Sequence, residues 1–115
     1  MLVIKEEDWM KNIWFCSKDG EKILDKSRLS EAINIINYAI DLEKDYLEKE
    51  CLTGNLKDFQ SDFFVKIVDH GSKFEVDLAP KSGEGHDFNF IVKKHKKQLI
   101  RDSLSIGEVI SEPRD

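Results

Sequence analysis

The sequence predicts an α+β fold, in which a mainly antiparallel sheet of three to five strands carries one long helix on a face. Apolar residues recur at spacings of three, four and seven between Leu29 and Cys51, which is the pattern of an amphipathic helix. Residues 63–68 and 73–78 have the composition of two strands joined by a turn, and residues 88–92 alternate as a third strand. A second helix is expected near the C-terminus.

The length of 115 residues suits one domain with its own hydrophobic core. We therefore predict a single globular domain over residues 1–115, with residues 110–115 as a frayed tail. The chain is 40% hydrophobic and 36% charged, and its formal net charge is −5 at pH 7. These values are typical of a folded, soluble protein.

The first residues differ from a secretion signal, because the apolar residues 1–4 are followed directly by Lys5 and three carboxylates. No apolar run approaches the roughly 20 residues that span a bilayer. Cys16 and Cys51 match no CxxC spacing, so we expect buried thiols rather than a disulfide. Together these observations predict a cytoplasmic protein.

The N-terminal segment allows two interpretations. Residues 1–4 suit a short strand, and the carboxylates that follow at Glu6, Glu7 and Asp8 would stabilise the start of a helix. Apolar residues between 9 and 14 recur at helical spacing. Residues 13–24, however, also contain an Asp-Gly pair between two apolar runs, which is typical of a hairpin. The hairpin is slightly favoured.

The long helix has recognisable ends. Ser27 or Ser30 can cap its start, and residues 53–55 (Thr-Gly-Asn) can end it. Glu43 falls on the apolar side of this helix, between Ile36 and Leu47. Because an unpaired buried carboxylate is costly, we expect the last turns to project beyond the core.

Downstream of the helix, turn residues separate the expected strands. Residues 69–72 (Asp-His-Gly-Ser) form the turn of a hairpin, and residues 80–87 form a loop before the third strand. The C-terminal helix is expected over residues 94–104.

The polar side of the long helix carries an acidic column. Its members recur at spacings of three and four and so share one stripe: Asn34, Asn37, Asp41, Asp45 and Glu48. A solvated surface with local ion pairs explains such a stripe. Alternatively, neighbouring carboxylates repel each other, and this small cost is tolerated because the stripe meets a basic partner.

The chain also has one basic segment. Residues 93–101 concentrate four lysines and one arginine, which could release counterions from a nucleic acid. The segment lacks the interleaved aromatic residues that stack on bases, and a solvated surface is the favoured interpretation.

Catalytic and metal-binding motifs are not found. His70, His86 and His95 lie outside any zinc-ligand spacing, and residues 82–85 (Ser-Gly-Glu-Gly) lack the lysine of a phosphate-binding loop. We expect no metal, no cofactor and no enzymatic activity. His70 and His86 both lie in expected turns next to an aspartate, and they are the residues that a small enzyme would use.

The remaining features favour a protein-binding function. An acidic surface can accelerate encounter with a basic protein and fix its register through carboxylate contacts to Lys and Arg. The expected contacts are Asp41, Asp45 and Glu48 on the helix, with Glu6, Glu7 and Asp8 as outlying members.

In size, acidity and expected location the chain resembles bacterial toxin-immunity proteins, whose acidic surfaces can cover the basic site of a nuclease toxin. The resemblance is one of overall profile and carries no residue positions. It implies an inhibitor of a basic partner. A phage or plasmid inhibitor of a host nuclease system would share this profile. Two further classes fit the sequence less well, namely a small nucleic-acid-associated protein that uses residues 93–101 and a small His-dependent enzyme.

Overall fold

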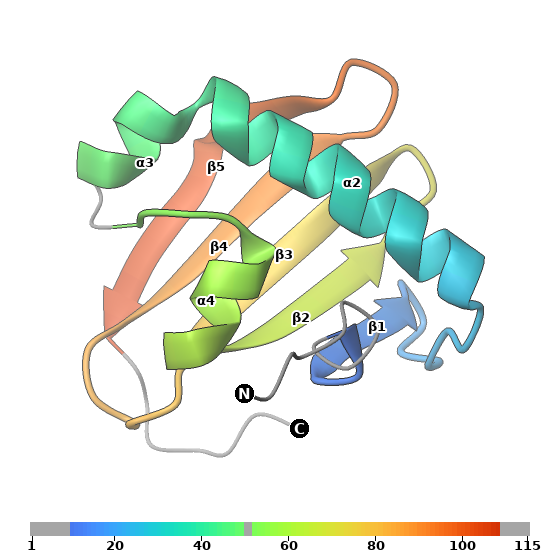
Figure 1. Cartoon of the computed structure of the whole chain (residues 1–115), viewed down its shortest axis with the longest axis horizontal. Helices are drawn as coiled ribbons and strands as arrows, with labels where there is room; N and C mark the ends of the chain where they lie inside the picture. The colour runs from blue at the N-terminus through green and yellow to red at the C-terminus, as the bar shows by residue number, and fades with distance from the viewer. Residues whose placement is uncertain (1–9, 50–51, 109–115) are drawn as a thin grey trace, which may run out of the picture.

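The fold is α+β, with a five-stranded sheet whose one face is crossed by a long helix (Figure 1). The computed structural model describes residues 10–49 and 52–108, and within β5 the side chains are described only as far as Leu99. The elements in chain order are β1 (Ile13–Ser17), α2 (Lys26–Leu42), α3 (Lys44–Lys49), α4 (Leu56–Asp62), β2 (Phe63–Asp69), β3 (Lys73–Pro80), β4 (His86–Lys93) and β5 (Gln98–Glu108).

The sheet is mixed rather than purely antiparallel. Its strand order is β1-β2-β3-β4-β5, and the last four strands form an antiparallel meander. β1 pairs in parallel with β2 because the three helices between them return the chain to the starting end of the sheet. The α+β prediction is therefore confirmed, while the parallel edge strand was not predicted.

The first described residues form a strand and a turn. β1 is followed by a turn at Gly20, whose φ of 87° suits glycine. The return arm pairs with β1 through one antiparallel bridge, between Cys16 and Lys22, and through the backbone hydrogen bonds Ser17 N–H to Glu21 and Ile23 N–H to Phe15. The favoured hairpin therefore forms in part, and its return arm is not a second strand of the sheet. The expected strand at residues 1–4 lies outside the described residues.

α2 begins at a different cap from the one expected. The Asp25 carboxylate accepts hydrogen bonds from the backbone of Ser27 and Arg28, at 2.9 and 3.3 Å. The predictions of Ser27 or Ser30 as the cap were wrong, because an aspartate directly before the first turn fills this role. The buried face of α2 packs on the sheet through Ala32, Ile33, Ile36, Ala39 and Ile40.

The expected continuous helix is broken at Glu43. This residue is the C-cap of α2, and α3 starts at the next position. Residues 53–55 do not end the long helix, because Asn55 instead caps the start of α4 in a reciprocal pair with Asp58. α4 has only seven residues and was not predicted.

The predicted C-terminal helix was wrong. Residues 94–97 form the turn between β4 and β5, and Lys97 takes a positive φ of 47° there. Leu99 of β5 pairs with Val92 and is buried in the core under α2. A strand satisfies the hydrogen-bonding edge of β4, which a helix would have left open.

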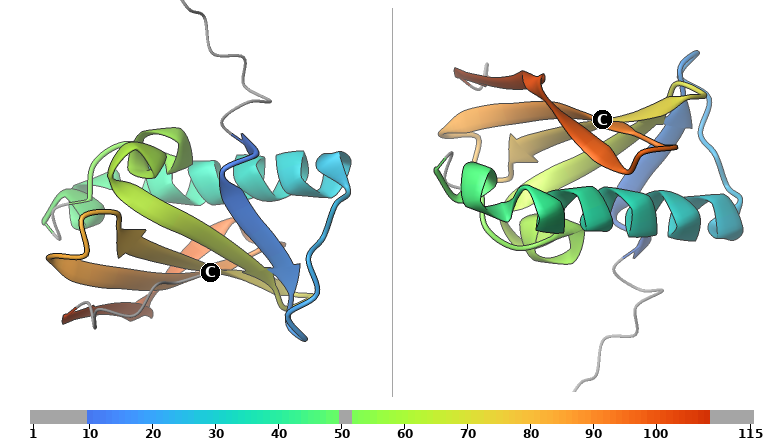
Figure 2. Two further views of the ribbon diagram at one scale, coloured as in Figure 1. Left: turned by 90° about the horizontal axis from the view of Figure 1, so that it is seen from below. Right: turned by 90° about the horizontal axis from the view of Figure 1, so that it is seen from above.

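The core lies between the sheet and the helices. Alternate strand residues face α2 and α4, as Val65, Val76 and Phe90 do. Seen from the side, α2 lies on one face of the sheet, and no described helix covers the opposite face (Figure 2). That uncovered side is called the open face below. In the described part of the chain, no helix is both long enough and apolar enough to cross a membrane.

Candidate functional site

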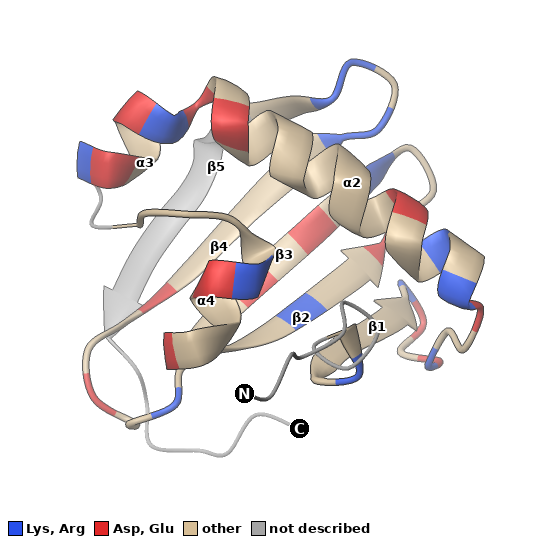
Figure 3. Ribbon diagram, viewed as in Figure 1, with Lys and Arg blue, Asp and Glu red and all other residues tan. Residues whose placement is uncertain are grey.

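Three of the six predicted contact residues lie together at the end of α2 and along α3. Asp41 is in the last turn of α2, and Asp45 and Glu48 are in α3; all three are exposed. Figure 3 shows acidic residues gathered at this end of the molecule. Glu6, Glu7 and Asp8 lie outside the described residues.

Two large exposed apolar side chains lie near Asp41 in the last turns of α2, and they were missed in the sequence. Tyr38 is 52% exposed and Leu42 is 61% exposed. Because they are four residues apart, and Asp41 is three residues from Tyr38, these side chains share one face of α2. We call Tyr38, Asp41, Leu42, Asp45 and Glu48 the acidic helical surface.

The chain segment that carries most of this surface is mainly acidic. Residues 41–49 carry four carboxylates and two lysines. The Lys97 ammonium also lies 5.3 Å from the centre of the Tyr38 ring. This contact places one of the chain's own cations over the exposed ring.

Asp41 occupies an electrostatically unfavourable position. The C-terminal end of a helix carries a partial negative charge, so a carboxylate there costs about 0.3–1 kcal/mol. α2 has no basic residue in its last turn that would offset this cost. Asp41 therefore does not stabilise the helix that carries it.

Asn37, a member of the predicted polar column, has a structural role instead. Its side-chain oxygen accepts a hydrogen bond of 3.0 Å from the backbone N–H of Leu56, the first residue of α4. This bond fixes α4 against α2. Asn34, another member of the column, is exposed.

The basic segment begins at the end of β4 and includes the β4–β5 turn. The Lys94 ammonium donates to Asp69 at 2.7 Å and lies 4.5 Å from the centre of the Phe74 ring. Lys97 contacts Tyr38 as described above. Lys94 and Lys97 of the basic segment thus make contacts within the chain.

The two histidines of the alternative catalytic pair are not brought together. His70 lies in the turn before β3, and His86 starts β4 after the loop that follows β3. They therefore stand at opposite ends of the eight-residue strand β3.

A polar network that the sequence did not reveal crosses the open face. Glu75 accepts from Asn89 at 2.8 Å and pairs with His70 at 2.8 Å, and Asn89 also donates to Asp77 at 2.6 Å. The hydrogen bonds from Asn89 and His70 lower the pKa of Glu75, against the opposing effect of burial, and the charges of His70 and Lys66 lower it further. The network ties β3 to β4.

A second ion cluster fixes the start of α2 to the sheet. Asp69, at the end of β2, accepts from Arg28 at 3.0 Å and from Lys94 at 2.7 Å. Burial raises the pKa of Asp69, but hydrogen bonds from Lys94, the Gly71 backbone and Arg28 outweigh it, so the pKa lies below its usual value.

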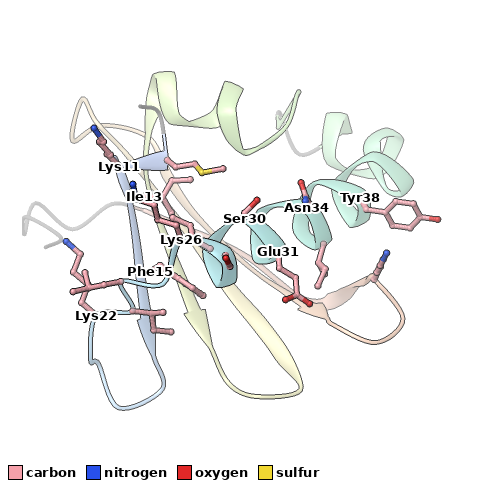
Figure 4. A pocket seen from close by; sticks show the side chains of 16 residues that line it. Lys11, Ile13, Phe15, Lys22, Lys26, Ser30, Glu31, Asn34 and Tyr38 are labelled. Atoms are coloured by element: carbon pink, nitrogen blue, oxygen red, sulfur yellow. The ribbon is translucent and has the colours of Figure 1, made fainter. Parts of the chain in front are cut away.

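A wide groove of about 1160 Å³ borders α2 and β1 (Figure 4). Ile13 and Phe15 of β1 line one part of it, and Ser30 and Asn34 of α2 line another. The labelled polar side chains do not converge on one point as those of an active site do (Figure 4). Among the described residues, no three His, Cys, Asp or Glu side chains gather as metal ligands.

Comparison of the chain with protein-family models, with curated proteins and with solved structures finds no match.

Proposed function

We propose that this chain is a non-catalytic inhibitor that binds a basic partner protein through the acidic helical surface. The partner class that fits best is a nuclease-type toxin, since carboxylates can cover a cationic nucleic-acid site. The protein then acts as a bacterial immunity protein in the cytoplasm. A phage or plasmid inhibitor of a host nuclease system would use the same chemistry.

The observation that supports this proposal is the exposure of Tyr38 and Leu42 beside the exposed carboxylate of Asp41. Binding energy in protein interfaces concentrates in a few large side chains, among which tyrosine is enriched. Surrounding charges mainly raise the association rate and select the partner. The acidic helical surface combines both kinds of residue.

The position of Asp41 gives a second argument. A carboxylate at a helix C-terminus lowers stability, and α3 begins with a further carboxylate, Asp45, in its first turn. Helix stability does not favour this arrangement. Recognition of Lys and Arg on a partner would favour it.

Capture of the partner is the first experiment. The tagged full chain is used as bait in an extract of its native host, and bound proteins are identified by mass spectrometry. We expect a protein with a basic surface, and we expect its association rate with the purified chain to fall steeply as salt is added. Captured proteins that are acidic, or an association rate that is independent of salt, would contradict the proposal.

Charge reversal then tests the surface itself. The triple variant Asp41→Lys, Asp45→Lys and Glu48→Lys should slow association at least about tenfold, because attraction becomes repulsion. The Asp41→Lys variant alone should be as stable as the natural chain or more stable, because a cation suits that helix end. Stopped-flow kinetics and urea unfolding measure the two effects.

A matched triple variant controls for net charge. Asp19→Lys, Glu21→Lys and Glu84→Lys change three exposed carboxylates outside the acidic helical surface. This control should retain most of the association rate, whereas Tyr38→Ala should speed dissociation. Equal binding by both triple variants would sink the proposal.

A further inference from the structure

The open face of the sheet carries two exposed aromatic side chains near its β1 edge. Trp14 is 38% exposed and Phe64 is 52% exposed. Strand alternation turns both away from α2, since their neighbours Ile13, Phe15 and Val65 are buried under the helices. Exposed aromatic side chains of this size are typical of interaction sites.

These two side chains border a hollow of about 180 Å³. In the sheet register Trp14 lies opposite Lys66, and Phe64 lies opposite Ala79. Ala79, whose side chain is small, also lines the hollow. The volume is below the roughly 300 Å³ at which small-molecule pockets begin. The hollow therefore suits one inserted side chain rather than a whole metabolite.

The charges that line the hollow are mainly positive. Lys11, Lys22 and Lys66 line it together with a single carboxylate, Asp77. The Lys22 ammonium lies 5.2 Å from the centre of the Trp14 ring, and Asp77 accepts a hydrogen bond from Asn89. An occupant with carboxylates beside its inserted side chain would complement these lysines.

A nucleic acid fits this surface less well. Asp77, which lines the hollow, and Glu75, which does not, carry negative charge along the open face of β3. A phosphate chain bears a charge at every nucleotide and would meet both carboxylates as it extended across the sheet, whereas a short acidic segment can place its carboxylates at the lysines alone. Lys22 also stands over the Trp14 ring, where a base would stack.

We propose that the hollow between Trp14 and Phe64 binds one apolar side chain of an acidic protein segment. The segment inserts a residue of leucine size, and its flanking carboxylates lie near Lys11, Lys22 and Lys66. This site lies on the open face of the sheet, away from α2. It is independent of the acidic helical surface and of its partner.

The test uses nuclear magnetic resonance of the ¹⁵N-labelled full chain with a defined probe. The probe is the blocked peptide N-acetyl-Glu-Asp-Leu-Asp-Glu-amide. We expect saturable shifts of the Trp14 indole and of the Phe64 and Lys66 amides. Replacing the central leucine of the probe by serine should weaken binding at least about tenfold, because the buried side chain is lost. Replacing its carboxylates by lysines should abolish binding.

Variants of the chain locate the site. Phe64→Ser and Lys22→Ser should each weaken peptide binding several-fold, and neither removes a core residue. Leu24→Ser is the matched control, because Leu24 is 79% exposed and does not line the hollow. It should bind as the natural chain does.

Four results would overturn this inference. The peptide shifts could fall on other residues or be unchanged in Phe64→Ser. A twelve-nucleotide oligothymidine could shift the Trp14 and Phe64 signals at lower concentration than the peptide. The chain alone could show concentration-dependent shifts of these signals, which would make a second copy the occupant.

Discussion

At the scale of single residues, Asp69 and Glu75 hold together parts of the fold that are distant in sequence. Asp69 joins α2 to the β4–β5 turn through Arg28 and Lys94. Glu75 joins β3 to β4 through Asn89. Both carboxylates have a pKa below the usual value because these partners favour the ionised form. Their ionisation is therefore coupled to folding.

Acid should weaken the fold through these two groups. When the folded pKa is the lower one, the unfolded chain takes up protons first as the pH falls. The stabilisation is complete well above the usual pKa values of 4.5 for Glu75 and 3.8 for Asp69, and it is lost as the pH falls below them. The free energy of urea unfolding, measured from neutral pH to about pH 3, should show this loss.

The Asp69→Asn variant separates this effect from general acid sensitivity. It should be less stable at neutral pH, because Arg28 and Lys94 lose their anion. Its stability should also decline less between neutral and acid pH, since the variant lacks the Asp69 carboxyl group, whose protonation is coupled to unfolding. Parallel declines in the variant and the natural chain would show that Asp69 is not coupled to folding.

At the scale of elements, the join between α2 and α4 depends on one side chain. Asn37 accepts from Leu56 N–H, a partly buried bond that begins α4. We predict that Asn37→Leu will lower the free energy of unfolding by about 1–3 kcal/mol, because a buried donor is left without a partner. Asn37→Asp keeps the acceptor and should be close to the natural chain. If both variants unfold at the same urea concentration, the bond contributes nothing measurable.

The elements that the sequence predicted correctly are the ones with strong local patterns. The buried repeat from Ile33 to Ile40 identified α2, composition identified β2, and alternation identified β3 and β4. The break at Glu43 was read only as a change in exposure, because a mid-helix carboxylate does not distinguish a projecting end from a new helix. β5 was missed because its pairing with β4 is a long-range contact that local periodicity does not contain.

The candidate sites also differ in how far the sequence alone could predict them. Asp41, Asp45 and Glu48 could be named from the helical spacing alone. Tyr38 and Leu42 fall on the outward side of the same repeat, so the spacing contained a signal that they are exposed. The hollow at Trp14 and Phe64 required the sheet register, which joins strands about fifty residues apart. No local pattern supplies that register.

At the scale of the whole molecule, the sheet separates two chemically different sides. The helices cover one face and carry the acidic helical surface, while the open face carries the aromatic hollow and the Glu75 network (Figure 2). The buried face of α2 packs on the sheet, and the core lies between them. Both candidate sites therefore depend on the same core.

This shared core allows a test of the expectation that the chain is a single domain. Ile36 is fully buried at the middle of α2, and its neighbour Ile35 is only partly buried. Ile36→Ala should cost about 2–5 kcal/mol, a large part of the 5–15 kcal/mol that stabilises a typical domain, whereas Ile35→Ala should cost less.

Urea unfolding is followed by far-ultraviolet circular dichroism and by tryptophan fluorescence, to which Trp14 of β1 contributes. One domain requires that both signals change at the same urea concentration and shift together in Ile36→Ala. Two separate transitions would show instead that β1 and the helices unfold as independent units.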